Sequence, residues 1–575
     1  MNDRSKSLPT WRRRAGAATA ALATVALAGS ALAAPATAGA ERNRDSAQHQ
    51  TQKPGKDKGK HHGKHKPGKN KPGKHKPKPG ADKSSRALQK AVTLRGVRNH
   101  LVALQRIADQ NDGNRASGTP GYRASRDYVV RTLRQAGYRP QVQKFDFAFF
   151  QVTGPTTFAQ TAPTARTFVE DQDYALMDYS GSGSVTAPVQ AVDLNLGNVT
   201  GSTSGCEATD FAGFTAGNIA LVRRGTCPFG DKVVNAQNAG AAGVILMNTG
   251  TPGATDVFAG TLGGPVGTVP SVGTSFAIGQ SLAEGATVTL SASTESEIRP
   301  TWNVVAETRQ GRSDNVVMAG AHLDSVVEGP GINDNGSGSA GLLEVAVQLA
   351  KTKTKPKNQV RFAWWGAEEK GLLGAEHYVA DLVENDPDTL EEIALYLNFD
   401  MIGSPNYALF VYDGDNSAAF PDGAVGPEGS DAIEALFHEH FEDAGLESAE
   451  TAFSGRSDYG PFIAEGIASG GLFTGAEGIK TPELAAAFGG TAGVAFDECY
   501  HAECDDLGNV SNKALDANSD AIAHAVHTYA RSTWTVNGVG KRDDRTRRGE
   551  GASPRSGLRA PHDGGHDHAH HLPAH

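Results

Sequence analysis

The sequence predicts an α/β domain with a mostly parallel central sheet flanked by helices, interrupted by an inserted β-rich module. From residue 298 onward, short apolar runs of strand length alternate with helix-like segments, the order that gives a parallel sheet with helices on both faces. Residues 149–297 have a different amino-acid composition, rich in Gly, Thr, Val and Ala. Residues 91–148 have the pattern of two amphipathic helices and a strand, so we expect them to complete the α/β domain.

The first forty residues have the pattern of an export signal. Arg12, Arg13 and Arg14 precede an Ala, Val and Leu run over residues 15–33, and small residues that suit cleavage follow. A membrane anchor is the alternative, but the run is short and rich in alanine. We therefore expect a secreted, extracellular protein, and the arginines leave a twin-arginine export route open.

Residues 41–90 form a basic segment, with 16 Lys and Arg against 4 Asp and Glu, although the whole chain carries a net charge of −9. Their Lys, His, Pro and Gly cannot bury a core, so we expect a disordered arm. The arm is a spacer or a removable segment, or it tethers the protein to an anionic cell-wall polymer. It lacks interleaved aromatic residues and the rest of the chain is acidic, which argues against specific nucleic-acid binding.

The four cysteines fall in two pairs. Cys206 and Cys227 lie in the inserted module, whereas Cys499 and Cys504 lie near the end of the α/β domain. An even count in an exported chain predicts two local disulfides. Neither pair has the spacing of a zinc ribbon, so we do not expect these cysteines to bind a metal.

Side chains that commonly bind metals follow the predicted strands. The run 316–323 leads into His322 and Asp324, which alternate around Leu323 and therefore point to one side of an extended chain. Sites in parallel sheets form at the carboxyl ends of strands, where we expect these groups to meet. Later strand ends and loops carry Asp334, Glu368, Glu369, Asp400 and His501.

This combination favours a metal centre. A pair such as Glu368 and Glu369 most often lies on a solvated face, but several carboxylates and two histidines at successive strand ends are harder to explain that way. Mixed His and carboxylate ligation suits zinc, and a carboxylate shared by two ions suits hydrolysis at a two-metal site. The available residues suffice for two ions and leave one glutamate as a base.

Six short motifs occur in order along the α/β domain: His322-Leu-Asp-Ser-Val, Gly331-Ile-Asn-Asp-Asn-Gly-Ser-Gly-Ser339, Phe362-Ala-Trp-Trp-Gly-Ala-Glu-Glu369, Leu397-Asn-Phe-Asp-Met-Ile-Gly-Ser404, Gly455-Arg-Ser-Asp458 and Cys499-Tyr-His-Ala-Glu-Cys504. Together they resemble the secreted bacterial di-zinc aminopeptidases, which remove leucine and other large apolar N-terminal residues. The inserted module, with Gly205-Cys206 and Arg224-Gly-Thr-Cys-Pro-Phe229, resembles the protease-associated domain of the aminopeptidase Y type. The resemblance implies a zinc exopeptidase domain over 91–148 and 298–534 and a protease-associated domain over 149–297.

The resemblance also implies a role for each matched residue. Glu368 would be the general base, which takes a proton from the attacking water and returns it to the leaving amine. Asp324 would accept the other imidazole N–H of His322 and hold its orientation. The metal ligands would be His322 and Asp400 for one zinc, Glu369 and His501 for the other, and Asp334 as the bridge.

Further matched residues imply how a peptide would bind. Tyr500 and Arg456 match the residues that stabilise the tetrahedral oxyanion or hold the substrate beside it. The free α-amine would lie against acidic groups, and Met401 and Phe473 would line an apolar pocket for the first side chain. As alternatives, Phe473 is plain core and Arg456 pairs with a neighbouring acid.

A calcium site is a feature of the family that this sequence matches only in part. Asp516 and Asp520 match its C-terminal portion, but the partner aspartate would fall near Ala91. Two carboxylates are few for a hard cation, so the sequence leaves calcium open without favouring it.

Residues 535–575 turn basic and then rich in histidine. We expect a disordered tail, with a loose metal scavenger that feeds the zinc site as the alternative. Nothing in the sequence suggests more than a monomer.

Two rival functions have different requirements. A carboxypeptidase or dipeptidase on the same metal core would need added basic groups to grip a substrate carboxylate, whereas only Arg456 lies near the matched motifs. A polyanion-binding protein acting through the basic arm would have no use for Glu368. We therefore expect a secreted zinc aminopeptidase that acts on the N-termini of peptides or proteins.

Overall fold

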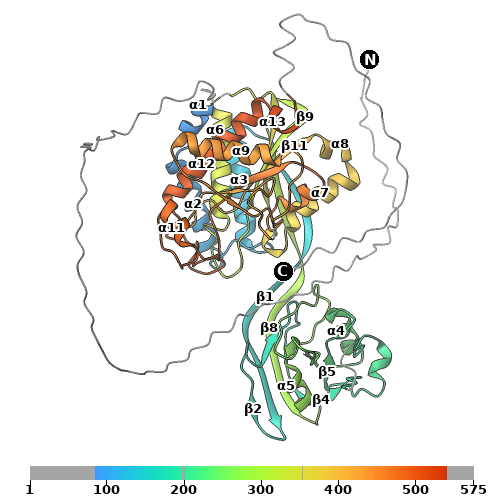
Figure 1. The fold of residues 1–575 in the computed structure, drawn as a ribbon. Coiled ribbons are helices and arrows are strands. Elements are labelled where there is room, and N and C mark those ends of the chain that lie inside the picture. Colours follow the sequence, from blue (N-terminus) through green and yellow to red (C-terminus); the bar gives the residue numbers. More distant parts are fainter. Residues whose placement is uncertain (1–84, 197–200, 353, 422, 540–575) are drawn as a thin grey trace, which may run out of the picture. The chain divides into compact units, whose positions relative to one another are not determined.

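The computed structural model describes residues 85–196, 201–352, 354–421 and 423–539 (Figure 1). They divide into an inserted unit, Ala148–Glu297, and an α/β unit formed by the described residues before and after it. Both boundaries fall inside long strands, β1 (Gln141–Ala162) and β8 (Thr287–Glu307). In the described part of the chain, no helix combines the length and apolar character needed to cross a membrane.

The sheet of the α/β unit has the strand order β13-β12-β14-β11-β9-β10-β8. Strand β9 lies between β10 and β11 and is parallel to both, whereas the β8–β10 and β12–β14 pairs are antiparallel. The predicted mostly parallel sheet is therefore confirmed. Besides β8, the strands of this sheet are β9 (Arg312–His322), β10 (Asn358–Trp365), β11 (Ile393–Phe399), β12 (Phe410–Tyr412), β13 (Ala449–Thr451) and β14 (Ser469–Phe473).

Each face of this sheet has its own hydrophobic core, because successive side chains of a strand point to opposite faces. On one face, side chains such as Phe362 pack with α1 (Ser85–Ala91), α2 (Leu94–Asp109), α3 (Pro120–Ala136), α6 (Gly336–Lys351), α9 (Ser430–Ala444) and α12 (Asn512–Arg531) (Figure 1). On the other face, Trp365 and Tyr396 pack with α7 (Leu373–Asn385) and α10 (Gly460–Ala464). Shorter helices are α8 (Pro387–Glu391), α11 (Pro482–Phe488) and α13 (Trp534–Asn537).

Polar residues set the starts of the helices that cover the sheet. The side chain of Thr93 accepts the N–H of Gly96 at 3.1 Å, which caps α2. Helix α3 begins with Pro120 after the capping residue Thr119 and ends before Gly137, whose φ of 100° suits glycine. The turn-rich composition of residues 113–122 predicts a loop, but α3 begins inside that stretch.

The inserted unit has the strand order β8-β4-β5-β6-β7-β3, in which the β4–β5, β5–β6 and β6–β7 pairs are parallel, whereas the β8–β4 and β7–β3 pairs are antiparallel. A disulfide joins Cys206 to Cys227, with 5.8 Å between the Cα atoms, as predicted. The elements are β2 (Arg166–Thr167), β3 (Tyr174–Leu176), β4 (Gly183–Ala191), η1 (Ala208–Phe211), β5 (Ile219–Arg223), α4 (Phe229–Asn238), β6 (Gly243–Met247), β7 (Ser271–Thr274) and α5 (Phe276–Leu282).

The ends of the described chain differ from the expected boundaries. The basic arm was expected to reach residue 90, but residues 85–91 form α1, which packs on α12 and buries Leu88. The His-rich tail was expected from residue 535, but α13 extends to Asn537 and buries Val536. Packing of these apolar side chains offsets the weak helical tendency of such short segments. The export signal and most of the arm and tail lie outside the described residues.

The core on the α9 face gives a stability prediction. Phe437 is fully buried, and its ring meets that of Phe399 edge to face, with a centroid separation of 6.4 Å. Removal of the ring in Phe437→Ala should lower the free energy of unfolding of the α/β unit by about 3–5 kcal/mol. Leu446→Ala, at a residue that is 41% exposed, should change it by less than about 0.5 kcal/mol.

Urea unfolding followed by tryptophan fluorescence checks this prediction. Every described tryptophan lies in the α/β unit, at positions 302, 364, 365 and 534, so the signal reports that unit. Equal midpoints for the two variants would contradict the packing described for α9.

Candidate metal centre

Three neighbouring strands bring polar side chains to one edge of the α/β sheet. His322 is the last residue of β9, Glu368 and Glu369 follow β10 in the short helix η2 (Glu368–Lys370), and Asp400 follows β11. Because these strands are parallel neighbours, their carboxyl ends lie side by side. The structure thus brings together residues that are far apart in the sequence.

Asp334 lies between two histidines. Its Oδ1 is 3.3 Å from Nε2 of His322, and its Oδ2 is 3.2 Å from Nε2 of His501. Asp334 immediately precedes the N-cap of α6, Asn335, whose side chain accepts the N–H of Gly338 at 2.9 Å. The helix start therefore fixes the position of a carboxylate whose two oxygens face different imidazoles.

A further carboxylate flanks each histidine. Oδ1 of Asp400 is 3.1 Å from Nε2 of His322, and Oε2 of Glu369 is 3.0 Å from Nε2 of His501. Oε2 of Glu368 lies farther from His322 Nε2, at 3.8 Å. The arrangement runs from Asp400 through His322, Asp334 and His501 to Glu369, with Glu368 beside it.

The donors of this cluster fit metal ions. Ligand atoms of His322, Asp334 and Glu369 lie within 4.8 Å of one another, and so do those of His322, Glu368 and Asp400. Oε1 of Glu369 is buried and has no hydrogen-bond partner, which is costly for a carboxylate unless a cation binds it. Imidazole nitrogens with carboxylate oxygens form a donor set that suits zinc.

A pocket of about 190 Å³ opens onto this cluster. Met401, Phe473, Tyr412 and Tyr459 supply apolar and aromatic surface to its lining. Phe473 also belongs to the aromatic packing of the sheet, with its ring 6.1 Å from that of Phe410. The pocket combines an apolar side with the polar cluster.

Two other expected residues, Arg456 and Tyr500, line the same pocket. Arg456 forms an exposed ion pair with Glu477 at 3.6 Å, which is the pairing that the sequence analysis held as an alternative. The ring of Tyr500 stacks on that of His501 at 3.9 Å. The predicted disulfide Cys499–Cys504 closes the loop that carries Tyr500 and His501.

Comparison with known proteins identifies the family. Residues 303–526 match peptidase family M28, and residues 185–282 match the PA domain. An aminopeptidase of Pseudomonas aeruginosa is 49% identical over 457 residues, which cover 78% of this chain and 83% of that protein. The chain belongs to peptidase family M28. The resemblance found in the sequence, the inserted PA domain and the assignment as a peptidase are thereby confirmed.

Other M28 relatives extend the comparison. Leucine aminopeptidase 2 of Trichophyton rubrum is 42% identical over 466 residues, covering 79% of this chain and 88% of that protein. Among solved structures, a zinc aminopeptidase from Bacillus subtilis superposes with a TM-score of 0.50 at 25% identity, covering 75% of this chain and 95% of its own.

Asp505 holds the loop of Asp334 in this M28 peptidase, and sequence reasoning gave it no role. Its carboxylate accepts the backbone N–H of Asn333 at 2.8 Å and that of Asp334 at 2.9 Å. Burial is the main reason that the pKa of Asp505 rises to about 7. The hydrogen bonds that its carboxylate accepts lower this pKa and so oppose the shift. The only signal in the sequence was its position directly after Cys504.

Arg115 is a second residue that sequence reasoning missed. Its guanidinium is fully buried and donates to the carbonyl oxygens of Leu323, Pro330 and Gly331. Burial lowers its pKa to about 10, although Asp505 and other carboxylates oppose this, so the group stays charged at neutral pH. Arg115 thus ties together the chain on either side of the loop between His322 and Asp334.

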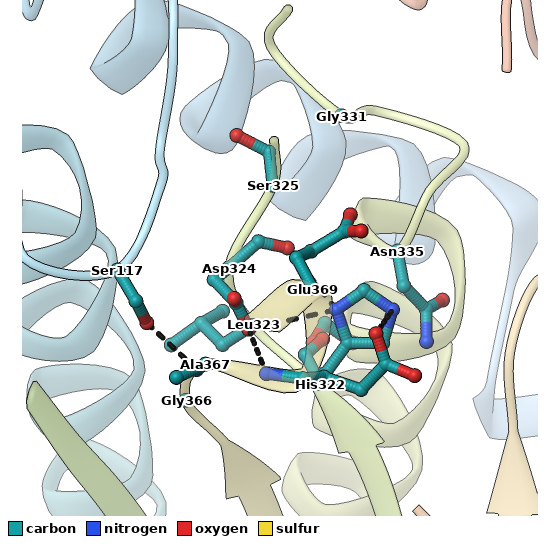
Figure 2. Close-up of polar contacts among 12 residues, drawn as sticks. Ser117, His322, Leu323, Asp324, Ser325, Gly331, Asn335, Gly366, Ala367 and Glu369 are labelled. Atoms are coloured by element: carbon teal, nitrogen blue, oxygen red, sulfur yellow. Dashed lines mark hydrogen bonds and ion pairs between the residues drawn. The ribbon is translucent and has the colours of Figure 1, made fainter. Parts of the chain in front are cut away.

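The strand ends are held by short side chains around Asp324 (Figure 2). The N–H of Ala367 donates to Oγ of Ser117 at 2.7 Å, and that of Glu368 donates to Oδ1 of Asp324 at 3.3 Å. Nδ1 of His322 is 3.2 Å from the backbone carbonyl of Asp324 and 3.6 Å from its carboxylate. The carbonyl is therefore the nearer acceptor for the His322 ring, where the sequence led us to expect the carboxylate.

Ser457 and Asp458 support the Asp400 side of the cluster. Oγ of Ser457 donates to Oδ2 of Asp400 at 2.6 Å and accepts from Asn398 at 2.9 Å. Asp458 is fully buried, and neither of its oxygens has a hydrogen-bond partner. Burial raises the pKa of Asp458 well above its usual range. The charge of Asp400 raises this pKa further, whereas His322 lowers it.

The crowding of carboxylates shifts the other ionisable groups of the cluster. Burial raises the pKa of Glu368 well above its ordinary value, and Asp400 and Asp458 raise it further, although His322 opposes them. Burial, together with Asp334, raises the pKa of Glu369 to about 7. Loss of solvation is the main cause of both shifts, and repulsion from neighbouring carboxylates adds to it.

The two aspartates considered for calcium lie on α12, outside this cluster. Asp516 is exposed and Asp520 is partly buried. Burial and the charge of Asp516 raise the pKa of Asp520 to about 6. Ala91, at the position of the missing aspartate, ends α1, which packs on α12. The structure places the three positions on two packed helices, and among the described residues no group of three metal-binding side chains includes Asp516 or Asp520.

The role of Asp505 gives a prediction about metal affinity. Asp505→Asn exchanges one acceptor oxygen for an amide that cannot accept the N–H of Asp334, so the carboxylate of Asp334 should be held less firmly. We expect zinc affinity to fall by roughly 10- to 100-fold, as measured by competition with a chromophoric chelator. Asp506→Asn, at the exposed neighbouring residue, is the matched control and should bind zinc like the wild type. Equal affinities in all three proteins would exclude this role.

Proposed function

We propose that this M28 peptidase is a secreted zinc aminopeptidase that removes large apolar residues from the N-termini of peptides with a two-metal site. The observation that carries the proposal is the position of Asp334, whose two oxygens face His322 and His501 at 3.3 and 3.2 Å. A single carboxylate presented to two imidazoles, each with its own flanking carboxylate, is suited to bridge two ions.

The proposed ligands follow from this arrangement. His322 and Asp400 would hold one zinc, Glu369 and His501 the other, and Asp334 both. Bound zinc supplies Lewis-acid polarisation of a peptide carbonyl and lowers the pKa of water. Support comes from the zinc aminopeptidase of Bacillus subtilis among the similar structures and from relatives that are named aminopeptidases.

Glu368 is the proposed general base. It lines the pocket beside the cluster, and its Oε2 is 3.8 Å from Nε2 of His322. The raised pKa of this buried carboxyl group makes it a stronger proton acceptor than an exposed glutamate. Glu368 would take a proton from the attacking water and deliver it to the leaving amine.

Tyr500 and Arg456 are the proposed donors to the oxyanion. Burial and the nearby Asp334 and Glu369 raise the pKa of Tyr500, so its phenol keeps its proton and can donate a hydrogen bond at any physiological pH. Stacking on His501 holds the ring beside the cluster. Arg456, on the pocket rim, would turn from Glu477 toward a bound substrate.

The charges that line the pocket favour a free α-amine over a carboxylate. Arg456 is its one basic residue among the described ones, and it already pairs with Glu477. Its acidic lining residues are Asp334, Glu368, Glu369, Asp400 and Glu477. A carboxypeptidase would need the opposite balance, so the pocket supports an aminopeptidase.

The apolar part of the pocket supports a preference for large apolar first residues. Met401 and Phe473 line it, together with the aromatic side chains Tyr412 and Tyr459. Leucine aminopeptidase 2 of Trichophyton rubrum is named for such a substrate. We propose that the first side chain of the peptide packs on this surface.

Other parts of the proposal rest on the sequence. Export through residues 1–40, a tether role of the basic arm, a monomeric state and a role of the PA domain in substrate access remain expectations. Calcium at Asp516 and Asp520 is no part of the proposed activity. Removal of residues 41–84, which ends before α1, should leave peptidase activity unchanged, because the polyanion-binding alternative alone requires this arm.

A pair of substrates tests the direction of cleavage. Leucine p-nitroanilide should be hydrolysed, whereas its N-acetylated form should not, because acetylation removes the positive charge that the acidic pocket recognises. Chelation should abolish the activity and added zinc should restore it. Release of residues from the C-terminus of a peptide, with no hydrolysis of the anilide, would instead show a carboxypeptidase.

The proposed base has its own test. Glu368→Gln should lower kcat by roughly 10²- to 10⁴-fold and leave zinc binding near that of the wild type, because the amide cannot take a proton. Glu384→Gln, at an exposed residue of α7, is the control and should retain full activity. A Glu368→Gln variant with wild-type kcat would remove Glu368 from the mechanism.

A further inference from the structure

A second group of metal-binding side chains comes from α9 and β13. Glu434 and His438 are four residues apart on α9 and so share one face of the helix, and Glu450 lies in β13. The ligand atoms of these three residues lie within 4.8 Å of one another. We propose that Glu434, His438 and Glu450 form a binding site for one divalent ion of the zinc type, separate from the M28 metal centre.

The hydrogen bonds of His438 support this proposal. Nδ1 of its ring is 2.7 Å from Oγ of Ser448, whereas Nε2 is buried and has no hydrogen-bond partner. A ring that donates through Nδ1 carries a free lone pair on Nε2. This pattern is typical of histidines that bind metals, in which one nitrogen is held by a neighbour and the other is the ligand.

One oxygen of Glu434 is likewise held in place. Its Oε2 accepts the N–H of Gly414 at 2.8 Å, and its Oε1 lies 3.8 Å from Nε2 of His438. The side chain of Glu434 is 12% exposed and that of His438 is 28% exposed. The free oxygen and the free nitrogen therefore face each other at a partly buried position that solvent can still reach.

The charge around these residues favours a cation. Asp413 and Asp415 follow β12, and ligand atoms of both lie within 4.8 Å of one from Glu434. The oxygens of Asp413 are occupied by the N–H groups of Ser417 and Ala418, both at 2.9 Å, so Asp413 adds charge without being a free ligand. Within the described ranges, no Lys or Arg forms an ion pair with Glu434 or Glu450.

The ligand atoms of Glu434, His438 and Glu450 indicate which kind of metal ion would bind. One imidazole and two carboxylates suit zinc, with solvent completing the shell. Calcium prefers oxygen donors throughout, which the imidazole of His438 does not provide. Because Glu450 precedes Thr451, which lines the substrate pocket, an ion here would fix the strand beside that pocket without touching the substrate.

Zinc stoichiometry tests the proposal. The full-length wild type, Glu450→Gln and His438→Asn are equilibrated at a buffered micromolar concentration of free zinc, and bound zinc per chain is counted by elemental analysis. Each variant should bind one zinc fewer than the wild type. Glu447→Gln, at an exposed residue outside the three-ligand group, is the matched control and should bind as many as the wild type.

The results of this zinc count do not depend on whether the proposed peptidase function is correct. Equal zinc counts in the wild type and both variants would overturn the proposal and leave a protonated His438 as the partner of Glu434. An equal loss in Glu447→Gln would also overturn it, because it would show diffuse binding to an acidic surface. Anomalous diffraction at the zinc edge gives a second test, since a peak among Glu434, His438 and Glu450 is required whether or not the peptidase site is loaded.

Discussion

The α/β unit of this M28 peptidase must hold several carboxylates close together in a buried cluster, where they repel one another. Asp324 and Asp458 are fully buried, Asp334 is nearly so, and Glu369 has a buried oxygen without a partner. Such charges cannot stay together in a medium of low dielectric constant unless cations or protons balance them. In the proposed zinc-loaded site the two imidazoles are neutral ligands, so the metal ions would balance this charge. The folded state and the bound ions are therefore linked, since binding to the folded chain alone stabilises it.

The surrounding scaffold keeps these groups in place against their repulsion. Parallel strands bring His322 and Asp400 to the same edge of the sheet, where the backbone is already fixed by pairing on both sides of β9. The loop carrying Asp334 has no such pairing and is held by side chains, Asp505 at its backbone N–H groups and Arg115 at neighbouring carbonyl groups. Buried polar groups that satisfy backbone atoms in this way limit the movement of a loop.

The sequence allowed prediction of the features that depend on local pattern or on chain order. The β-rich insertion followed from a change in composition, and His322, Glu369 and Asp400 followed from polar residues at the ends of apolar runs. Contacts that form only after the loops fold could not be predicted. The composition around Arg115 predicts only a turn-rich loop, and the hydrogen bonds of Asp505 depend on where the disulfide loop returns. The helix at residues 85–91 was missed because its stability depends on packing against α12, which the local composition does not reveal.

The location of the inserted unit within strands β1 and β8 has a consequence for the order of events during synthesis. Residues 148–297 form one continuous stretch, so this unit is complete on the ribosome before β9 has been made. Helices α1 and α2, made earlier, pack against α12 and α6, which are made later. At roughly 5–20 residues per second, these first helices wait tens of seconds for α12. The nascent chain thus folds from its middle, and its N-terminal segment joins a domain completed around it.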